Sequence, residues 1–140
     1  MLKIWGRANS VNVQKVLWCL RELDLAHERI DAGMAFGRNH DPDYLAMNPN
    51  GLVPTLEEED GFILWESNSI VRYLAAKHQN RTLEPADLKI RARAQMWMDW
   101  QLSVLGPSIT PVFWGLAVFF AFNVALNWWA YARRGAAHPC

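Results

Sequence analysis

Two serines of this chain lie where a helix is expected to begin. Ser10 follows a short apolar run that ends at Gly6, and Ser67 follows Glu66 at the start of a later amphipathic segment. The first turn of a helix leaves backbone N–H groups without partners, so a helix N-terminus is suited to bind an anion. Each serine can simply cap its helix, which stabilises it by about 1 kcal/mol, or add a hydroxyl donor to an anion site. The residues alone leave both interpretations open.

The pair Val53-Pro54 is a third candidate feature. A cis X-Pro bond occurs in about 5–6% of cases, so where it is found it normally marks a place that needs a special geometry. The alternative is an ordinary trans proline at the start of a strand. Cysteine chemistry is not expected, because Cys19 and Cys140 form no CxxC pair and no Cys/His cluster. We interpret Cys19, in the middle of a predicted helix, as part of the core.

The segments that must position these residues alternate between strand and helix patterns. Strands are predicted over 2–5, 27–31, 53–57 and 62–65, and helices over 11–23, 66–77 and 85–105, the last opened by Pro85. The region 33–44 is predicted to be a loop that can include one short helix. A helical crossover makes the first two strands parallel, and the Asp60-Gly61 turn makes the last two antiparallel. The expected fold is therefore α/β, a mixed four-stranded sheet with helices packed on it, as in thioredoxin.

Composition and charge restrict the possible functions. The chain has 140 residues, of which 51% are hydrophobic and 20% charged, so a folded core is expected. Fourteen basic residues balance fourteen acidic ones, which argues against a nucleic-acid partner. The first ten residues lack the pattern of a secretory signal, and two separated cysteines fit a reducing, cytoplasmic setting.

Three segments together resemble the amino-terminal domain of the glutathione transferase family. They are GRANSVNVQKV (6–16), NPNGLVPTL (48–56) and WESNSIVRYLAAKH (65–78), and the likeness is strongest to bacterial, theta-like members with an active-site serine. It continues more weakly to about residue 114. The resemblance implies a thioredoxin-like, glutathione-binding domain over residues 1–80, followed by an incomplete all-helical domain over residues 85–140.

The resemblance also implies roles for the candidate residues at the sulfur. Ser10 would be catalytic, donating a hydrogen bond to the glutathione sulfur, with Asn12 or a backbone N–H as the alternative donor. Lowering a thiol pKa by two units needs about 2.7 kcal/mol. A hydrogen bond to a charged group supplies about 1.5–3 kcal/mol and a helix dipole about 0.3–1 kcal/mol, so no stronger base is required.

The rest of the tripeptide would be held by four further positions. Val53, before a cis Pro54, would pair with the cysteinyl backbone. Glu66 would take the γ-glutamyl ammonium and Ser67 the γ-glutamyl carboxylate. His40 is the candidate for the glycine carboxylate, with Asn39 and Asn50 as alternatives.

The implied activity is transfer of the glutathione thiol to a small apolar electrophile. Glutathione would be the co-substrate, and we expect no cofactor and no metal. A homodimer is possible, as in similar proteins. The alternative is a non-catalytic glutathione-binding or interaction module, because the helical domain that would form most of the electrophile pocket is short.

The carboxyl-terminal part contains a long uncharged stretch. No charged residue occurs from Trp100 to Ala132, and Arg133 and Arg134 follow. Residues 109–132 are long enough for a membrane anchor, with aromatic residues and positive charge at one end. Prolines and asparagines within the stretch favour instead the helix of a shortened second domain. Membrane association is therefore the alternative to a cytoplasmic location.

Overall fold

The computed structural model describes residues 1–79, 82–116 and 119 of the chain. They belong to two compact units, Met1–Arg91 and Ala92–Cys140. The first unit contains the sheet, and the described part of the second is helical. Each unit is considered by itself.

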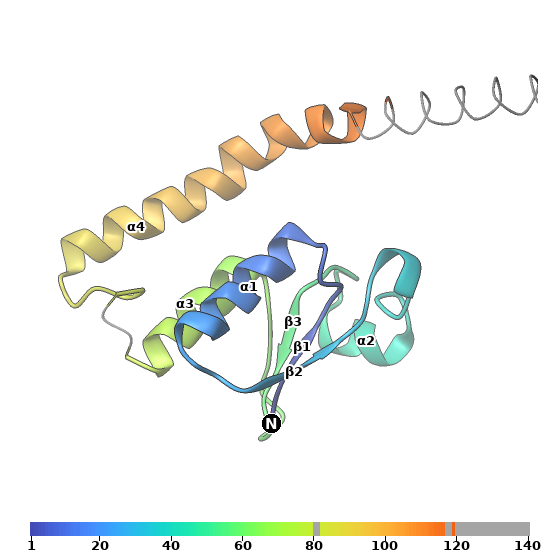
Figure 1. The fold of residues 1–140 in the computed structure, drawn as a ribbon, viewed down its shortest axis with the longest axis horizontal. Helices are drawn as coiled ribbons and strands as arrows, with labels where there is room; N and C mark the ends of the chain where they lie inside the picture. The colour runs from blue at the N-terminus through green and yellow to red at the C-terminus, as the bar shows by residue number, and fades with distance from the viewer. Residues whose placement is uncertain (80–81, 117–118, 120–140) are drawn as a thin grey trace, which may run out of the picture. The chain divides into compact units, whose positions relative to one another are not determined.

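The first unit is built on a mixed sheet of four strands (Figure 1). Its elements in chain order are β1 (Leu2–Trp5), α1 (Val11–Glu22), β2 (His27–Ile30), a 3₁₀ turn (Met34–Phe36), α2 (Pro42–Met47), β3 (Thr55–Glu57), β4 (Ile63–Trp65) and α3 (Ser67–Lys77). The strands lie in the order β2-β1-β3-β4. β1 runs parallel to β2, whereas β3 is antiparallel to both β1 and β4. The predicted thioredoxin-like sheet is confirmed.

Helices α1 and α3 lie side by side and bury one face of this sheet (Figure 1). Apolar residues at helical spacing on both helices meet alternate residues of the strands, and together they form the core: Ile4, Val13, Val16, Cys19, Leu20, Leu56, Ile70 and Leu74. Cys19 is 4% exposed, as expected for a core residue. Its burial raises the pKa of the thiol to about 11.

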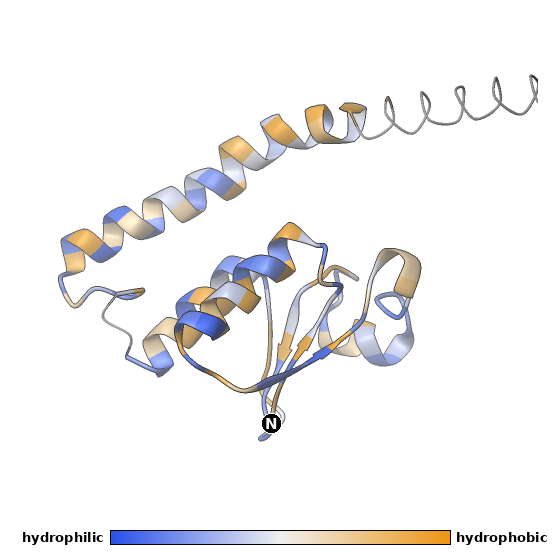
Figure 2. Ribbon diagram, viewed as in Figure 1, coloured by the Kyte–Doolittle hydropathy of each residue, from blue (hydrophilic) through white to orange (hydrophobic). Residues whose placement is uncertain are grey.

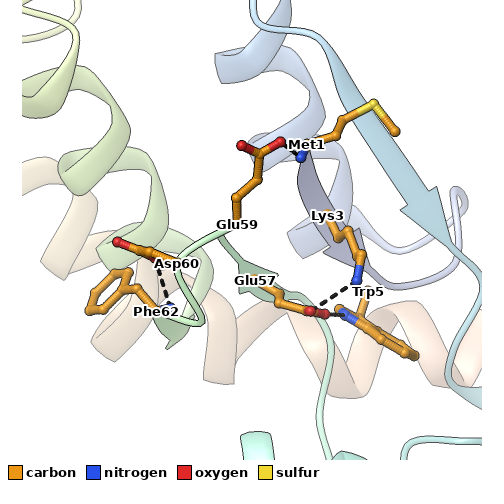
Figure 3. Close-up of polar contacts among 7 residues, drawn as sticks. All are labelled: Met1, Lys3, Trp5, Glu57, Glu59, Asp60 and Phe62. Atoms are coloured by element: carbon orange, nitrogen blue, oxygen red, sulfur yellow. Dashed lines mark hydrogen bonds and ion pairs between the residues drawn. The ribbon is translucent and has the colours of Figure 1, made fainter.

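The other face of the sheet carries polar side chains and α2. The ring of Trp5 meets the ring of Tyr44 from α2 edge-on, with centroids 6.1 Å apart. Glu57 accepts hydrogen bonds from Lys3 Nζ and Trp5 Nε1, both at 2.9 Å (Figure 3). These bonds hold the pKa of Glu57 below its usual range. Lys3 and Glu57 are cross-strand partners, so the contact fixes the register of β1 against β3.

The β3–β4 turn closes as its residue types predict. The carboxylate of Asp60 accepts the Phe62 N–H at 3.0 Å, and Gly61 has a positive φ of 88° (Figure 3). Glu59, in the same turn, pairs with the amino group of Met1.

Several boundaries differ from the sequence-based expectation. β3 begins at Thr55 rather than Val53, because Pro54 has no N–H to donate to the ladder. The short helix allowed for within 33–44 is present as α2, but it continues to Met47; Pro42 lies in its first turn, where a missing N–H costs nothing. α3 begins at Ser67 with Glu66 as its N-cap residue, so the prediction that Ser67 caps this helix is wrong.

The helix predicted to start at Pro85 also begins later. α4 spans Leu88–Trp100, and the carboxylate of Asp87 accepts the N–H groups of Lys89 at 2.8 Å and Ile90 at 3.0 Å. An aspartate N-cap therefore decides where the helix starts. A π-helical turn, Gln101–Leu105, follows α4, and helical backbone continues over 106–116. Pro107, just after that turn, cannot donate to an α-helical ladder, which accounts for the local change of period.

Hydrophobic residues recur along the described helix of the second unit (Figure 2), and many of their side chains are exposed. Those at least half exposed are Met96, Trp97, Leu102, Ile109, Val112, Phe113, Leu116 and Phe119. Within the described residues, no helix combines the length and the apolar character that crossing a bilayer requires. Most of the anchor predicted over 109–132 lies outside the described residues.

Candidate functional site

A small cleft lies where the turn before β3 meets the start of α3. It is lined by Asn12, Asn48, Asn50, Leu52, Val53, Pro54, Trp65, Glu66 and Ser67. Five predicted site residues, Asn12, Val53, Pro54, Glu66 and Ser67, are thus brought together from three separate segments. The fold places the first turn of α1, the residues preceding β3 and the first turn of α3 around one space.

The Val53-Pro54 peptide bond is cis, as the resemblance implied. Val53 lies close to the loop that joins β1 to α1. A Cβ atom at Gly6, where φ is +154°, would be 3.2 Å from Val53 Cβ and 2.5 Å from Val13 Cγ2. Only glycine allows this approach, and it brings the loop before Ser10 next to the cleft.

Buried hydroxyl and amide groups fix the turn before the cis proline. Tyr44 Oη donates to the Leu52 carbonyl at 2.6 Å, and Asn48 Nδ2 donates to the same carbonyl at 2.8 Å. Both side chains also meet Thr55 Oγ1, at 2.9 and 3.2 Å. Tyr44, Asn48 and Thr55 are each at most 2% exposed, and burial raises the pKa of Tyr44. No motif in the sequence indicated this network, because its hydrogen bonds depend on the folded turn and not on a linear pattern.

Helix α3 starts abruptly at the cleft. Glu66 adopts a positive φ of 72°, which turns the chain from β4 into the helix, and its carbonyl accepts the Ile70 N–H at 2.9 Å. Ser67 is the first helical residue and is 5% exposed. The first amides of α3 have no partner within the helix. The cleft therefore offers an exposed carboxylate beside a hydroxyl and helix N-terminal N–H groups, a combination suited to a zwitterion.

A lysine on α1 reaches the same helix start. Lys15 Nζ donates to Asn68 Oδ1 at 3.0 Å, and Asn68 is 5% exposed. Burial lowers the pKa of Lys15, and the charge of Glu66 opposes that shift. In the sequence Lys15 is only one of the polar residues between apolar helix positions, so no pattern singled it out.

Ser10 occupies the N-cap position of α1 and is 7% exposed. Its carbonyl accepts the Gln14 N–H at 2.9 Å, but its hydroxyl makes no capping hydrogen bond. Ser10 is not among the residues that line the cleft, whereas Asn12 is. The two candidate donors to the sulfur thus lie two residues apart at one helix start.

The three loop candidates lie together around Gly51. Asn39 Nδ2 donates to the Gly51 carbonyl at 2.7 Å. The exposed ring of His40 packs so closely that a Cβ at Gly51 would be 2.8 Å from His40 Nδ1. Asn50 lines the cleft itself. Among the described residues, no group of three metal-binding side chains is present.

Comparison with known proteins agrees with this geometry. The family model described as the glutathione S-transferase N-terminal domain matches residues 9–77. Glutathione S-transferase GstB of Escherichia coli is 52% identical over 117 residues, which are 83% of this chain and 56% of the relative. Residues 9–77 are therefore the amino-terminal domain of the glutathione transferase family.

Solved structures of family members show the same fold. The theta-class glutathione S-transferase of the citrus canker pathogen Xanthomonas axonopodis pv. citri, with glutathione bound, has a TM-score of 0.77 at 48% identity, over 81% of this chain and 54% of that one. An epsilon-class enzyme from the housefly Musca domestica has a TM-score of 0.76 at 30% identity, over 86% and 56%. The resemblance to theta-like bacterial transferases is confirmed, and the chain spans about half the length of these relatives.

Proposed function

We propose that this chain binds glutathione in the cleft and activates its thiol for transfer to a small apolar electrophile. One observation carries the proposal: the residue before a cis proline and the first turn of a helix face one space. The first offers a backbone edge for a peptide, and the second offers an anion site next to a carboxylate. Glutathione combines a peptide backbone with a terminal group that carries both charges.

The γ-glutamyl end would bind at Glu66 and Ser67. The carboxylate of Glu66 would take the ammonium, and the Ser67 hydroxyl with the first amides of α3 would take the carboxylate. The cysteinyl backbone would pair with Val53. Asn50 is the loop candidate best placed for the glycine carboxylate, since it lines the cleft, while Asn39 and His40 support it around Gly51.

The thiol would point to the start of α1. There the Ser10 hydroxyl, which makes no capping bond, can donate to the sulfur, with the Asn12 amide as the alternative donor. The thiol loses its proton to solvent, and the thiolate electron pair forms a C–S bond with the electrophile. A leaving group departs with its bonding electrons, or an added carbon centre takes a proton from water.

Calorimetric titration of the full chain with glutathione tests the binding site. Ser67→Ala removes a donor to a charged group, so we expect an affinity about ten- to a hundredfold lower. Ser69→Ala, in the same helix turn but outside the cleft lining, is the control and should bind as the wild type does. Absence of binding by a folded wild-type chain would overturn the proposal.

Thiolate absorbance of bound glutathione, followed against pH, tests the activation step. Ser10→Ala should raise the thiol pKa by about one to two units, because a hydrogen bond to the thiolate is lost. Asn12→Ala should leave it unchanged. The reverse result would assign the donor role to Asn12.

A second candidate is glutathione binding without transfer. The lining of the cleft favours this candidate, because it offers little surface to an apolar electrophile. Among the described residues, its larger apolar members are Leu52, Val53 and Trp65, and most of the others are polar. Conjugation of a chromogenic chloronitrobenzene distinguishes the two candidates, since only a transferase consumes it above the uncatalysed rate. Light scattering on the same samples tests whether the chain forms a homodimer.

A further inference from the structure

Lys15 joins the two helices that carry the candidate site. It lies on α1, five residues after Ser10, and its ammonium donates to Asn68 on α3, directly after Ser67. The acceptor is an amide oxygen on a residue only 5% exposed. A lysine placed this way holds the start of α3 against α1 through a partly buried hydrogen bond.

The same ammonium lies within the electrostatic range of Glu66. Glu66 is the acidic residue lining the cleft, and its side chain is exposed there. A ligand ammonium that approaches Glu66 therefore meets a negative charge that Lys15 partly offsets. A ligand carboxylate that approaches Ser67 meets the helix N-terminus together with the positive charge of Lys15.

We propose that Lys15 is a positioning residue that makes this site selective for a terminal group carrying both charges. Lys15 holds Asn68 in place and balances Glu66, so that neither an amine alone nor a carboxylate alone satisfies the site. This inference rests on the proposed binding of glutathione, since it concerns how the γ-glutamyl end is chosen.

Loss of the Lys15 charge shifts this balance in a defined direction. Glu66 then attracts an ammonium more strongly, and the start of α3 attracts a carboxylate less strongly. Two peptides separate the effects: 4-aminobutyryl-Cys-Gly lacks the α-carboxylate of glutathione, and glutaryl-Cys-Gly lacks its ammonium. A purely structural role of Lys15 would weaken the binding of both peptides equally.

The experiment measures dissociation constants of the full chain for glutathione and these two peptides by calorimetry. In Lys15→Met, the ratio of the glutaryl constant to the aminobutyryl constant should rise by about three- to tenfold, the effect of one partly screened charge. Lys15→Gln, which keeps a donor for Asn68 but loses the charge, should show the same rise and serves if Lys15→Met does not fold.

Lys77→Met is the matched control, because it removes the same charge from the far end of α3. It should leave the ratio within twofold of the wild type. An unchanged ratio in both Lys15 variants, with wild-type binding intact, would overturn the role of Lys15 alone. A folded wild-type chain that binds none of the three peptides would overturn the proposed function, and this inference with it.

Discussion

The hydroxyl oxygen of Tyr44 lies 2.6 Å from the carbonyl oxygen of Leu52. This bond connects α2 to the residue that precedes Val53 and the cis proline. Tyr44 is 1% exposed, and its ring also packs against Trp5 of β1. The backbone at Val53, which the proposal assigns to the peptide ligand, is therefore fixed from inside the domain by a side chain that does not line the cleft.

Tyr44→Phe should lower the free energy of unfolding by about 1–2 kcal/mol, measured by urea denaturation. The Leu52 carbonyl keeps its bond from Asn48, which limits the loss. Glutathione affinity should fall as well, because the turn is held less firmly. Thr55→Ser keeps the hydroxyl that Tyr44 meets and should affect binding less. Unchanged stability in Tyr44→Phe would show that this network does not support the turn.

Gly6→Ala should destabilise the chain by about 2–4 kcal/mol, because the new methyl group would clash with Val13 in an unfavourable backbone conformation. Gly37→Ala is the matched control. It also has a positive φ, 59°, but a Cβ there would meet nothing within 4 Å. The free energy of unfolding should therefore fall by only about 1 kcal/mol. Equal losses in thermal or urea unfolding would mean that the close approach at Gly6 carries no cost.

Glu66→Gly separates stability from binding. Glycine accepts the φ of 72° without strain, so the free energy of unfolding should stay level or rise by about 1 kcal/mol. Glutathione affinity should nevertheless fall at least about tenfold, because the carboxylate that the proposal assigns to the γ-glutamyl ammonium is gone. Ser69→Gly, at an ordinary helix position, should instead destabilise by about 0.5–1 kcal/mol. A large loss of stability in Glu66→Gly would show that the Glu66 side chain stabilises the fold.

Cys19 should resist thiol reagents while the chain is folded. With a pKa of about 11, its thiolate fraction at pH 8 is about one in a thousand, and the side chain is buried. In a Cys140→Ser background, a colorimetric disulfide reagent should react far faster after unfolding in urea. Because burial raises the pKa of Cys19 in the folded state, its titration should reduce stability as pH rises from about 9 through 11. Fast labelling of the native chain at pH 8 would contradict the prediction that the Cys19 thiol is protected in the folded state.

The sequence predicted the sheet well because its strands and helices have clear periodicities. The apolar spacing of α1 and α3 and the Asp60-Gly61 turn are local patterns. Each involves only residues that are close together in the sequence. Helix starts were less predictable. Asp87 rather than Pro85 begins α4, and Glu66 rather than Ser67 occupies the N-cap position of α3, because the start of a helix depends on side-chain and backbone geometry that residue type alone does not fix.

The candidate site also has features that the sequence predicted and features that it did not. The cis bond and the meeting of Val53 with Glu66 and Ser67 were expected from the family resemblance. Tyr44 and Lys15 were not, because each acts through tertiary contacts that a linear pattern does not encode. The bond from Lys15 to Asn68 spans 53 positions of sequence.

The conformation of the Asn50-Gly51 pair affects how readily this protein undergoes chemical damage. Such pairs deamidate when the glycine nitrogen attacks the asparagine side chain, giving a succinimide and then aspartate or isoaspartate. Here Asn48 holds both groups: its carbonyl accepts the Gly51 N–H at 3.0 Å, and its Oδ1 accepts the Asn50 amide at 3.2 Å. The folded turn thus suppresses the reaction, and damage accumulates while the chain is unfolded. A molecule that refolds after that damage carries a new negative charge where the proposal places the glycine carboxylate of glutathione.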